Sequence, residues 1–492
     1  MQDAVRPGHI APTVPRQFIG GSWVEPNSTA VIDVEDPSTG EIVGAIAAGD
    51  AADINRAVAA AVDAMATARR TKWGPSARQD ALLALAAAIQ AEADEFARLE
   101  SLDSGKPVTN SRNVDVPVAA AALRYYAGWA TKLTGETMEL SSPGHASACT
   151  RVEPVGVVGQ IVPWNYPLVG AANKLGPAIA AGCAVVLKPA EQTSLSTLRL
   201  AELTARCGFP PGFVNVVTGR GEEAGAALVE HPDVAKISFT GSTAVGVKIA
   251  ESCGRQMKRC TVELGGKSAV IVMPDADIDA AARGIASSIF FNTGQSCSAG
   301  SRLFVHAKVR DQLVERIAEI ARTFRIGPAL DPETRLGPVI SEAQRSRVSG
   351  YVDDAVRRGA RPLVAGTLPQ GAGYFVAPTI LTDVPVNAPA LEEEIFGPVL
   401  CAIGFETEDL DEIAGWANDS RYGLAAYVWT SNIAVAHGLV DRLQAGTVRV
   451  NSGGGTDLAL PAGGVKMSGF GRENGRVGVM AYTELKSVVV AY

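Results

Sequence analysis

The sequence predicts an α/β protein made of two doubly wound α/β domains and a β-stranded extension. From residue 150 onward, short apolar runs rich in β-branched side chains alternate with helical patterns. Strands that are apolar throughout are typical of parallel sheets with helices on both faces. The chain has 492 residues, and at about 150 residues per domain this length predicts two or three folded units.

The predicted elements follow one another in two series. Residues 53–70 and 77–100 repeat apolar positions at helical spacing and predict two surface-packed helices. The first series of predicted strands then covers residues 156–162, 183–189, 213–219 and 236–241. The second series begins near Gly266 and includes the runs AVIVM, SRLFVHA, LCAIGF, AAYVWTS and TVRVNS, with helices between them.

Two further segments have the character of exposed strands. Residues 131–152 lack a strong helical period, and the C-terminal run ELKSVVVAY alternates between apolar and polar side chains. Strands with free edges usually find a partner. We therefore expect these segments to form an oligomerisation arm, in a homodimer or a homotetramer.

Composition and charge exclude several classes of function. The net charge is -8, and Lys and Arg are scattered along the chain, which argues against a nucleic-acid or membrane-surface partner. The seven cysteines form no CxxC pair, and the five histidines show no metal-binding spacing, so we expect no metal site. The N-terminal stretch has no apolar signal segment, and no apolar run is long enough to span a membrane. These features together predict a cytoplasmic protein.

Cys297 lies in the polar, small-residue segment FNTGQSCSAGSR, between a predicted helix and a predicted strand. A thiol in such a loop is accessible to solvent and substrate, and a lowered pKa would make it a nucleophile. The alternative interpretation is an inert structural cysteine. The sequence alone leaves both open.

Glu263 ends a short apolar run and precedes a Leu-Gly-Gly turn in TVELGGKS. Its carboxylate would stand at a strand end, where it could activate water to hydrolyse a thioester on a cysteine. A solvated glutamate is the alternative.

Asn165, in IVPWNYPLVG, follows a predicted strand and precedes a predicted helix. A rigidly held amide there could stabilise an oxyanion, or it could be a turn-forming asparagine.

Seven motifs occur in register along the chain: PWNYP, VLKPAE, FTGS, ELGGKS, GQSC, EEIFGPV and GGVKMSGFGRE. In this order they resemble the aldehyde dehydrogenase superfamily, over roughly residues 15–492. The resemblance implies a Rossmann-like NAD-binding domain over residues 1–130 and 153–264 and a catalytic domain over residues 265–467. It implies an oligomerisation extension over residues 131–152 and 468–492.

The resemblance also implies roles for individual residues. Cys297 would be the nucleophile, Glu263 the base that hydrolyses the thioester, and Asn165 with the Cys297 backbone N–H the oxyanion hole. Lys174 and Glu473 match family positions linked with proton relay near the base. The positions that match cofactor-binding residues of the family are Trp164, Lys188, Glu191, Gly241, Ser242, Leu264, Glu394 and Phe396.

NAD is the cofactor that these positions favour. In the family, Lys188 and Glu191 would reach the adenosine ribose, and a carboxylate there accepts a hydrogen bond from the 2'-hydroxyl but repels a 2'-phosphate. Use of NADP as well stays open. Ser242 would place the pyrophosphate at a helix N-terminus. The segment GRGEEAG lacks the usual GxGxxG spacing and predicts a turn into a helix instead.

The substrate is predicted only as a class of aldehyde. Members that oxidise betaine aldehyde surround the quaternary nitrogen with aromatic rings, and this chain keeps Tyr166 and Phe291 but has Asn173 and Ala462 at the other two positions. We expect a neutral aliphatic, aromatic or amino-aldehyde. Two alternatives remain: a CoA-acylating aldehyde dehydrogenase, and a non-catalytic homologue that serves as a structural or binding protein.

Overall fold

The structure is a computed structural model that describes residues 15–141, 144–455 and 457–492, so most of the polar N-terminal stretch lies outside it. The chain separates into two compact units, each described by itself below. Of the described residues, the first unit contains those in the ranges 15–104, 115–237 and 482–492, and the second contains those in 105–114 and 238–481. The assignment of cofactor, catalytic and oligomerisation parts to residue ranges stays a prediction.

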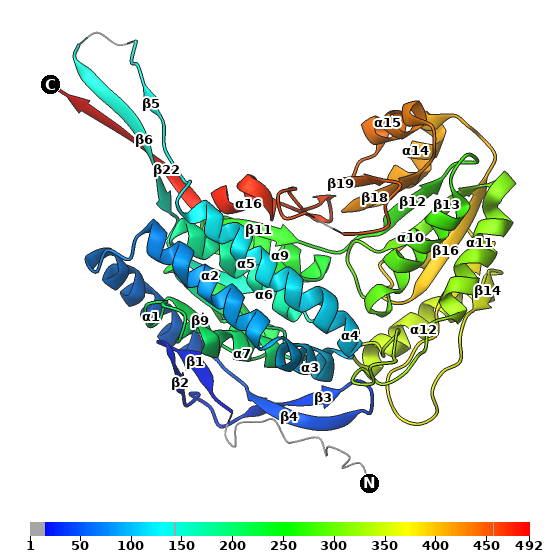
Figure 1. Ribbon diagram of the computed structural model, residues 1–492, viewed down its shortest axis with the longest axis horizontal. Helices are drawn as coiled ribbons and strands as arrows, with labels where there is room; N and C mark the ends of the chain where they lie inside the picture. Colours follow the sequence, from blue (N-terminus) through cyan, green and yellow to red (C-terminus); the bar gives the residue numbers. More distant parts are fainter. Residues whose placement is uncertain (1–14, 142–143, 456) are drawn as a thin grey trace. The chain divides into compact units, whose positions relative to one another are not determined.

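A sheet with parallel strands at its centre forms the middle of the first unit (Figure 1). The strand order is β2-β1-β9-β8-β7-β10, where β7, β8 and β9 are parallel and β1 joins β9 in the opposite direction. The strands are β1 (Gln17–Ile19), β2 (Ser22–Val24), β3 (Val31–Asp36), β4 (Glu41–Ala47), β5 (Thr137–Met138), β6 (Ala146–Pro154), β7 (Val157–Ile161), β8 (Val185–Lys188), β9 (Val214–Val216), β10 (Val234–Thr240), which leads into the second unit, and β22 (Thr483–Ala491). The four strands predicted between residues 156 and 241 are thereby confirmed.

Helices pack closely around this sheet. They are α1 (Ala51–Arg70), α2 (Pro75–Ala91), α3 (Ala93–Ser104), α5 (Val116–Ala130), α6 (Pro167–Ala181), α7 (Leu195–Thr204), α8 (Ala226–Glu230) and the π-helical turn η2 (Gly221–Gly225). α5 and α6 approach so closely that a Cβ at Gly176 would lie 2.5 Å from Cδ2 of Tyr126. The segment GRGEEAG is a turn into a helix, as predicted.

The prediction of two helices over residues 53–100 is wrong, because the second one is interrupted. α2 ends before Glu92 and α3 begins after it. The carboxylate of Glu92 forms ion pairs with Arg199 at 2.6 Å and with Arg206 at 3.3 Å. These ion pairs stabilise the break between the two helices. Both partners lie far along the chain from Glu92, so the helical period of the sequence could not predict them.

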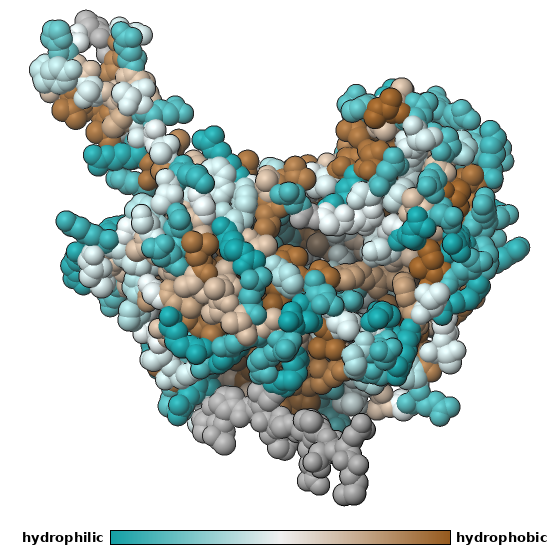
Figure 2. Space-filling view, viewed as in Figure 1, coloured by the Kyte–Doolittle hydropathy of each residue, from teal (hydrophilic) through white to brown (hydrophobic). Residues whose placement is uncertain are grey.

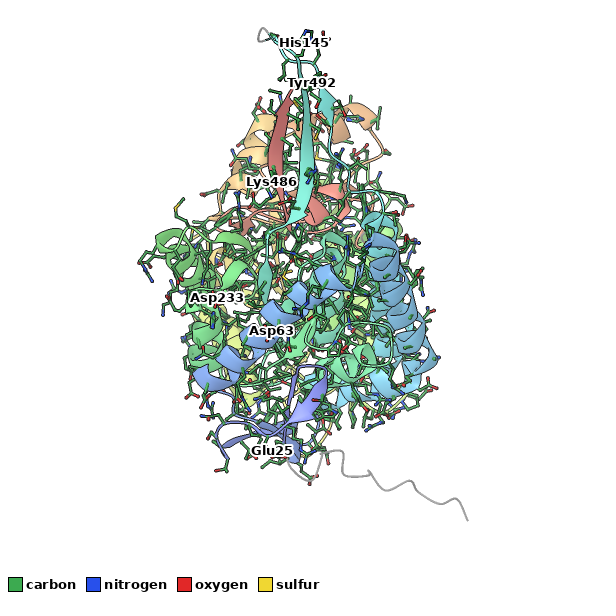
Figure 3. The ribbon with its side chains drawn as sticks, turned by 90° about the vertical axis from the view of Figure 1, so that its left-hand side faces the viewer. Glu25, Asp63, His145, Asp233, Lys486 and Tyr492 are labelled. Atoms are coloured by element: carbon green, nitrogen blue, oxygen red, sulfur yellow. The ribbon has the colours of Figure 1, made fainter. Side chains whose placement is uncertain are left out.

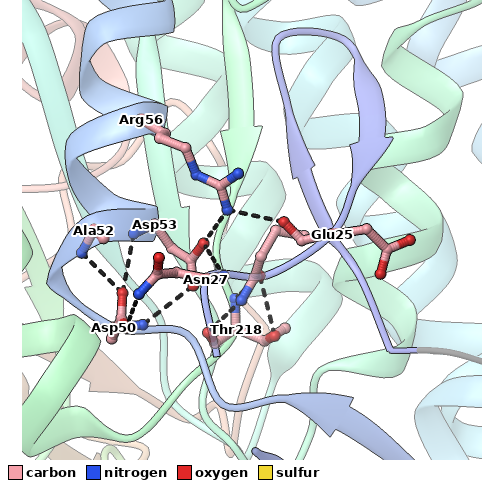
Figure 4. A network of polar contacts seen from close by, with 8 residues as sticks. Glu25, Asn27, Asp50, Ala52, Asp53, Arg56 and Thr218 are labelled. Carbon is pink, nitrogen blue, oxygen red and sulfur yellow. Dashed lines mark hydrogen bonds and ion pairs between the residues drawn. The ribbon is translucent and has the colours of Figure 1, made fainter. Parts of the chain in front are cut away.

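The start of α1 shows how side chains satisfy free backbone groups (Figure 4). The Asp50 side chain accepts hydrogen bonds from the backbone N–H groups of Ala52 and Asp53 at 2.8 and 3.2 Å. Asp53 accepts from the Asn27 N–H at 3.0 Å and forms an ion pair with Arg56. This reciprocal capping fixes where the helix begins.

An arm of three antiparallel strands extends from the first unit, in the order β22-β6-β5 (Figure 1). β22 pairs with β6 along its whole length, from Thr483 opposite Pro154 to Ala491 opposite Ala146. Lys486 forms an ion pair with Glu153 midway, and Tyr492 lies beside His145 at the end of the arm (Figure 3). The predicted C-terminal strand is confirmed.

The second unit contains a seven-stranded sheet in the order β14-β15-β16-β13-β12-β18-β19. All neighbours are parallel except β14 with β15. The strands of this unit are β11 (Arg259–Glu263), β12 (Ser268–Val272), β13 (Gly300–His306), β14 (Arg361–Val364), β15 (Thr379–Thr382), β16 (Val399–Phe405), β17 (Tyr422–Gly423), β18 (Ala425–Trp429), β19 (Thr447–Val450), β20 (Val465–Lys466) and β21 (Gly469–Phe470). Its helices are α4 (Val108–Asn110), α9 (Thr243–Arg255), α10 (Ile278–Phe290), α11 (Ala307–Arg322), α12 (Glu342–Arg357), α13 (Pro389–Glu392), α14 (Leu410–Asn418), α15 (Ile433–Arg442) and α16 (Gly475–Met480).

Successive residues of β12 enter different cores, which shows that both faces of this sheet are covered. Val270 packs in a cluster with Ile285 of α10 and Ile317 of α11. Ile271 packs in another cluster, with Ile413 of α14 and other apolar side chains. The doubly wound α/β class predicted from the sequence is thereby confirmed.

Candidate active site

The loop that carries Cys297 begins with an unusual backbone conformation. After α10, Asn292, Thr293 and Gly294 have φ values of 51, 55 and 73°. Two successive non-glycine residues in the left-handed region are strained, and Thr293 is also β-branched. Such strain persists only where surrounding contacts impose it, and the Thr293 hydroxyl donates to the Gly337 carbonyl at 2.9 Å.

Cys297 follows in a tight turn and remains partly exposed. Burial of its sulfur, together with the negative charges of Glu394 and Glu263, raises the pKa of the thiol to about 12. Hydrogen bonds from the N–H groups of Ser298 and Cys297 act in the opposite direction. The thiol is therefore protonated at neutral pH, and two carboxylate charges and two backbone donors act on it in opposite directions.

Glu263 is the last residue of β11 and pairs with Gly469 of β21. A Cβ at Gly463 would lie 2.6 Å from Oε1 of Glu263, so a larger residue there would displace this carboxylate. Gly463 has a φ of 147°, which also favours glycine. The negative charge of Glu263 acts on the Cys297 thiol and raises its pKa, so the two residues share one electrostatic environment.

Glu394 lies against the two glycines of the ELGGKS segment. The Gly266 N–H donates to Oε1 of Glu394 at 3.0 Å, and a Cβ at Gly265 would lie 2.2 Å from Oε2. Burial raises the pKa of Glu394, while the Gly266 hydrogen bond and the charges of Lys267 and Arg347 lower it. These interactions hold a half-buried carboxylate that can accept hydrogen bonds from a diol.

Phe396 occupies the left-handed region with a φ of 61°. The Gln344 amide donates to its carbonyl at 2.7 Å, and Arg347 donates to the carbonyl of Glu394 at 2.7 Å. Both partners belong to α12. This helix therefore holds the segment from Glu394 to Phe396 in its strained form.

The other predicted cofactor residues of the second unit lie near the end of β10. The Gly241 N–H donates to the Glu263 carbonyl at 3.1 Å. The N–H of the buried Leu264 donates to the backbone carbonyl of Ser468 at 3.0 Å. Ser242 is exposed and caps α9, accepting from the Val245 N–H at 3.4 Å. A helix N-terminus of this kind suits a phosphate group.

Glu473 also belongs to the second unit. Its backbone pairs with Ala462 in both directions, at 2.7 and 2.8 Å. Its carboxylate accepts from the Ser238 hydroxyl at 3.5 Å.

The first unit holds the remaining predicted residues, which follow the carboxyl ends of two neighbouring parallel strands or, for Lys174, lie in the helix after one of them. After β7, Trp164 and the buried Asn165 form the loop before α6, and Lys174 is buried within that helix. Lys188 ends β8, donates to the Pro189 carbonyl at 2.8 Å and pairs with Glu191 at 3.0 Å. Desolvation lowers the pKa of Lys188, and Glu191 opposes that shift.

Three buried polar residues near the site could not be recognised as important from the sequence. Gln295 links the loop of Cys297 to Ile340. The Ser468 hydroxyl donates to the Gly265 carbonyl at 2.7 Å and accepts from the Gly423 N–H at 3.0 Å. Burial lowers the pKa of Lys267 to about 8. Only the position of each residue inside a motif could have drawn attention to it.

Among the described residues, no group of three or more His, Cys, Asp or Glu side chains could hold a metal ion. The same part of the chain contains no helix that is long and apolar enough to cross a membrane.

Known proteins share this arrangement over nearly the whole chain. The Aldehyde dehydrogenase family model matches residues 23–488. Phenylacetaldehyde dehydrogenase of Pseudomonas fluorescens is 45% identical, with 97% of this chain and 96% of the relative covered. Among solved structures, the NAD+ complex of an aldehyde dehydrogenase from Bacillus cereus aligns with a TM-score of 0.94 and 41% identity, covering 97% and 96% of the two chains. A mutant indole-3-acetaldehyde dehydrogenase of P. syringae, solved with NAD+ and IAA, aligns with a TM-score of 0.93 and 39% identity, with the same coverage.

Proposed function

The chain belongs to the aldehyde dehydrogenase family, and on this basis we propose that it oxidises an aldehyde to a carboxylic acid with NAD as the electron acceptor. One observation carries the mechanism. Cys297 is a partly exposed residue, and the negative charge of Glu263 contributes to the raised pKa of its thiol. A cysteine and a glutamate base are chemically sufficient for a thioester mechanism without histidine.

In this mechanism the Cys297 thiol loses its proton to solvent, and the sulfur attacks the aldehyde carbon to form the oxyanion of a thiohemiacetal. The N–H groups that lie near the sulfur include that of Cys297 itself, and we assign to it and to the buried Asn165 amide the stabilisation of the developing oxyanion. NAD, when bound, supplies the acceptor for the hydride that leaves the substrate carbon. A thioester on Cys297 remains.

Hydrolysis of that thioester is assigned to Glu263. Its carboxylate takes a proton from water, the hydroxide adds to the acyl carbon, and the carbon–sulfur bond breaks. The proton then returns to the sulfur, so that free thiol and carboxylic acid result. Lys174 and Glu473 are proposed to carry protons to and from this base, a role that rests on the resemblance.

The residues present suit NAD in both units. Lys188 and Glu191 are proposed to bind the adenosine ribose, and Ser242 and Gly241 the pyrophosphate at the start of α9. Glu394 is proposed to bind the nicotinamide ribose, because its carboxylate, which the missing side chain of Gly265 leaves room for, can accept hydrogen bonds from a diol. Phe396, Leu264 and Trp164 complete the proposed cofactor contacts. Glu191 favours NAD because its carboxylate would repel a 2'-phosphate.

We propose an arylacetaldehyde as the substrate class. Two of the relatives are named for phenylacetaldehyde and indole-3-acetaldehyde. This chain also has the small residue Ala462 at a position that is aromatic in members that oxidise betaine aldehyde. This small side chain is proposed to accommodate the ring of the substrate.

The arm is proposed to join copies of this chain in a homodimer or homotetramer. Leu485 and Val489 of β22 are 64 and 59% exposed, and Figure 2 shows apolar side chains along the arm. A cytoplasmic location is also proposed, because all seven cysteines are free, as is typical of a reducing compartment.

An aldehyde panel tests the proposed function. Purified protein with NAD is mixed with phenylacetaldehyde, indole-3-acetaldehyde, short aliphatic aldehydes and betaine aldehyde, and NADH absorbance and the carboxylate product are measured. Arylacetaldehydes should give the highest kcat/KM, and Cys297→Ser should abolish NADH formation while NAD still binds. Retained activity in Cys297→Ser would refute the nucleophile. Faster turnover with added CoA, together with acyl-CoA as product, would favour the acylating alternative.

A further inference from the structure

Gln295 is a buried residue that the proposed mechanism does not use. Its side chain is 1% exposed, and both ends of its carboxamide are bonded to backbone groups. Nε2 donates to the Asn292 carbonyl at 3.1 Å, and Oε1 accepts from the Ile340 N–H at 2.9 Å. Gln295 therefore connects two segments that lie far apart in the sequence.

The first of these segments needs such support. Asn292 and Thr293 both adopt left-handed φ values, a conformation that non-glycine residues hold only when neighbours impose it. The Gln295 backbone N–H also donates to the Asn292 carbonyl, at 3.0 Å, and the Asn292 amide donates to the Gln295 carbonyl, at 3.3 Å. Gln295 thus closes the strained turn on itself.

The second segment, residues 337–340, forms two hydrogen bonds with the turn. Residues 337–340 accept a hydrogen bond from the Thr293 hydroxyl and donate one to Gln295. On another side, a Cβ at Gly294 would lie 2.1 Å from the Gly397 carbonyl, so the turn fits closely against the residue that follows Phe396. The conformation of the turn determines the direction in which the chain enters Cys297, two residues after Gln295.

We propose that Gln295 is a positioning residue for Cys297, which anchors the left-handed turn at residues 292–294 to Ile340 and so aims the sulfur and the N–H groups of Cys297 and Ser298. This inference rests on the proposed role of Cys297 as the nucleophile. Gln295 acts through the backbone, because both ends of its carboxamide form hydrogen bonds with backbone groups.

The test compares Gln295→Met with Gln17→Met. Gln17 is equally buried, and its carboxamide also bridges backbone groups, donating to the Thr218 carbonyl at 3.1 Å and accepting from its N–H at 2.8 Å. Both substitutions keep the volume and remove the hydrogen bonds. The measurements are the melting temperature, the rate of Cys297 alkylation by iodoacetamide followed by peptide mass spectrometry, and the rate of the first NADH turnover.

Both variants should melt at a lower temperature. Only Gln295→Met should also slow the first turnover, by about tenfold to a hundredfold, because small misplacements of a reacting atom have effects of this size. Its alkylation rate should change as well, while the KM for NAD changes little. If Gln295→Met matches Gln17→Met in alkylation and turnover, the inference is refuted. Cys297→Ser is the independent check, since its activity tests the proposed function and not the inference.

Gln295→Glu provides a second test, which stays informative even if Gln295→Met does not fold. A protonated carboxyl can donate to the Asn292 carbonyl and accept from Ile340, whereas a carboxylate can only accept. First-turnover rates of this variant, relative to the unmodified chain, should therefore fall as pH rises. A ratio that stays constant with pH would contradict the proposed donor role.

Discussion

The backbone N–H of Gly266 donates a 3.0 Å hydrogen bond to Oε1 of Glu394. The same glycine packs against the nucleophile loop, since a Cβ on it would lie 2.4 Å from the Cys297 carbonyl oxygen. One residue without a side chain therefore sets the spacing between the thiol and the carboxylate proposed for the nicotinamide ribose.

Gly266→Ala should impair both groups. The added methyl forces the loop of Cys297 or the Glu394 segment to move, so kcat should fall by about a hundredfold and the KM for NAD should rise. Gly254→Ala is the matched control, because a Cβ there meets nothing within 4 Å. Steady-state kinetics of both variants test this prediction. A Gly266→Ala enzyme with unchanged kcat and KM would contradict the close packing of Gly266 against the Cys297 loop.

Glu263→Gln should separate acylation from hydrolysis. The amide cannot accept a proton from water, so one NADH per active site should form quickly and steady turnover should then be slow, by about a hundredfold or more. Stopped-flow absorbance measures the two phases. Steady turnover equal to that of the unmodified chain would remove Glu263 from its proposed role.

Alkylation of Cys297 in the cofactor-free protein should have a steep pH dependence. The pKa of the thiol is about 12, so the thiolate fraction and the alkylation rate should rise about tenfold per pH unit up to about pH 10, without a plateau. Glu394→Gln removes a negative charge that raises this pKa, so alkylation at fixed pH should become faster.

Glu393→Gln is the control for that charge effect, because this exposed carboxylate bonds to Tyr351 instead. It should leave the profile of Cys297 unchanged. A plateau near neutral pH in the unmodified chain would show that the thiol is already activated without cofactor.

Glu191→Gln should shift the cofactor preference. Removing the negative charge relieves repulsion of a 2'-phosphate, so the ratio of kcat/KM for NADP to that for NAD should rise by about tenfold, or about 1.4 kcal/mol. Glu222 also acts on Lys188 through its charge and is exposed. Glu222→Gln is therefore the control, and an equal shift in both variants would argue for a general charge effect.

The arm can be tested by charge. Leu485→Glu and Val489→Glu place carboxylates on exposed apolar positions of β22, which should disrupt an apolar interface between copies. Light scattering after size-exclusion chromatography should show a smaller assembly than the unmodified chain. Lys486→Gln, which removes only the ion pair with Glu153 within the arm, should keep the assembly.

The fold was predictable where the apolar pattern alone decides it. The run at residues 183–189 became β8 and the run AVIVM became β12, because both strands are buried on two faces and are therefore apolar throughout. The break at Glu92 was not predictable, because the ion-pair partners of Glu92 are Arg199 in α7 and Arg206 in the turn after it. Local propensity carries no information about partners more than a hundred residues away.

The site was predictable as a set of motifs, but its geometry was not. Cys297 and Glu263 are predicted from their chemistry and by resemblance, and in the structure the charge of Glu263 raises the pKa of the Cys297 thiol. The left-handed backbone at Thr293 and Phe396 has no sequence signature, since β-branched and aromatic residues avoid it. The support from Gln295 likewise depends on Ile340, 45 positions further along the chain.

The hydrogen bond from the Ile340 N–H to Gln295 also makes this amide a natural reporter. Its proton exchanges with solvent only when the bond to the nucleophile loop opens. Deuterium uptake at that one amide would therefore record how often the loop around Cys297 unlocks, in the resting protein and without any substrate.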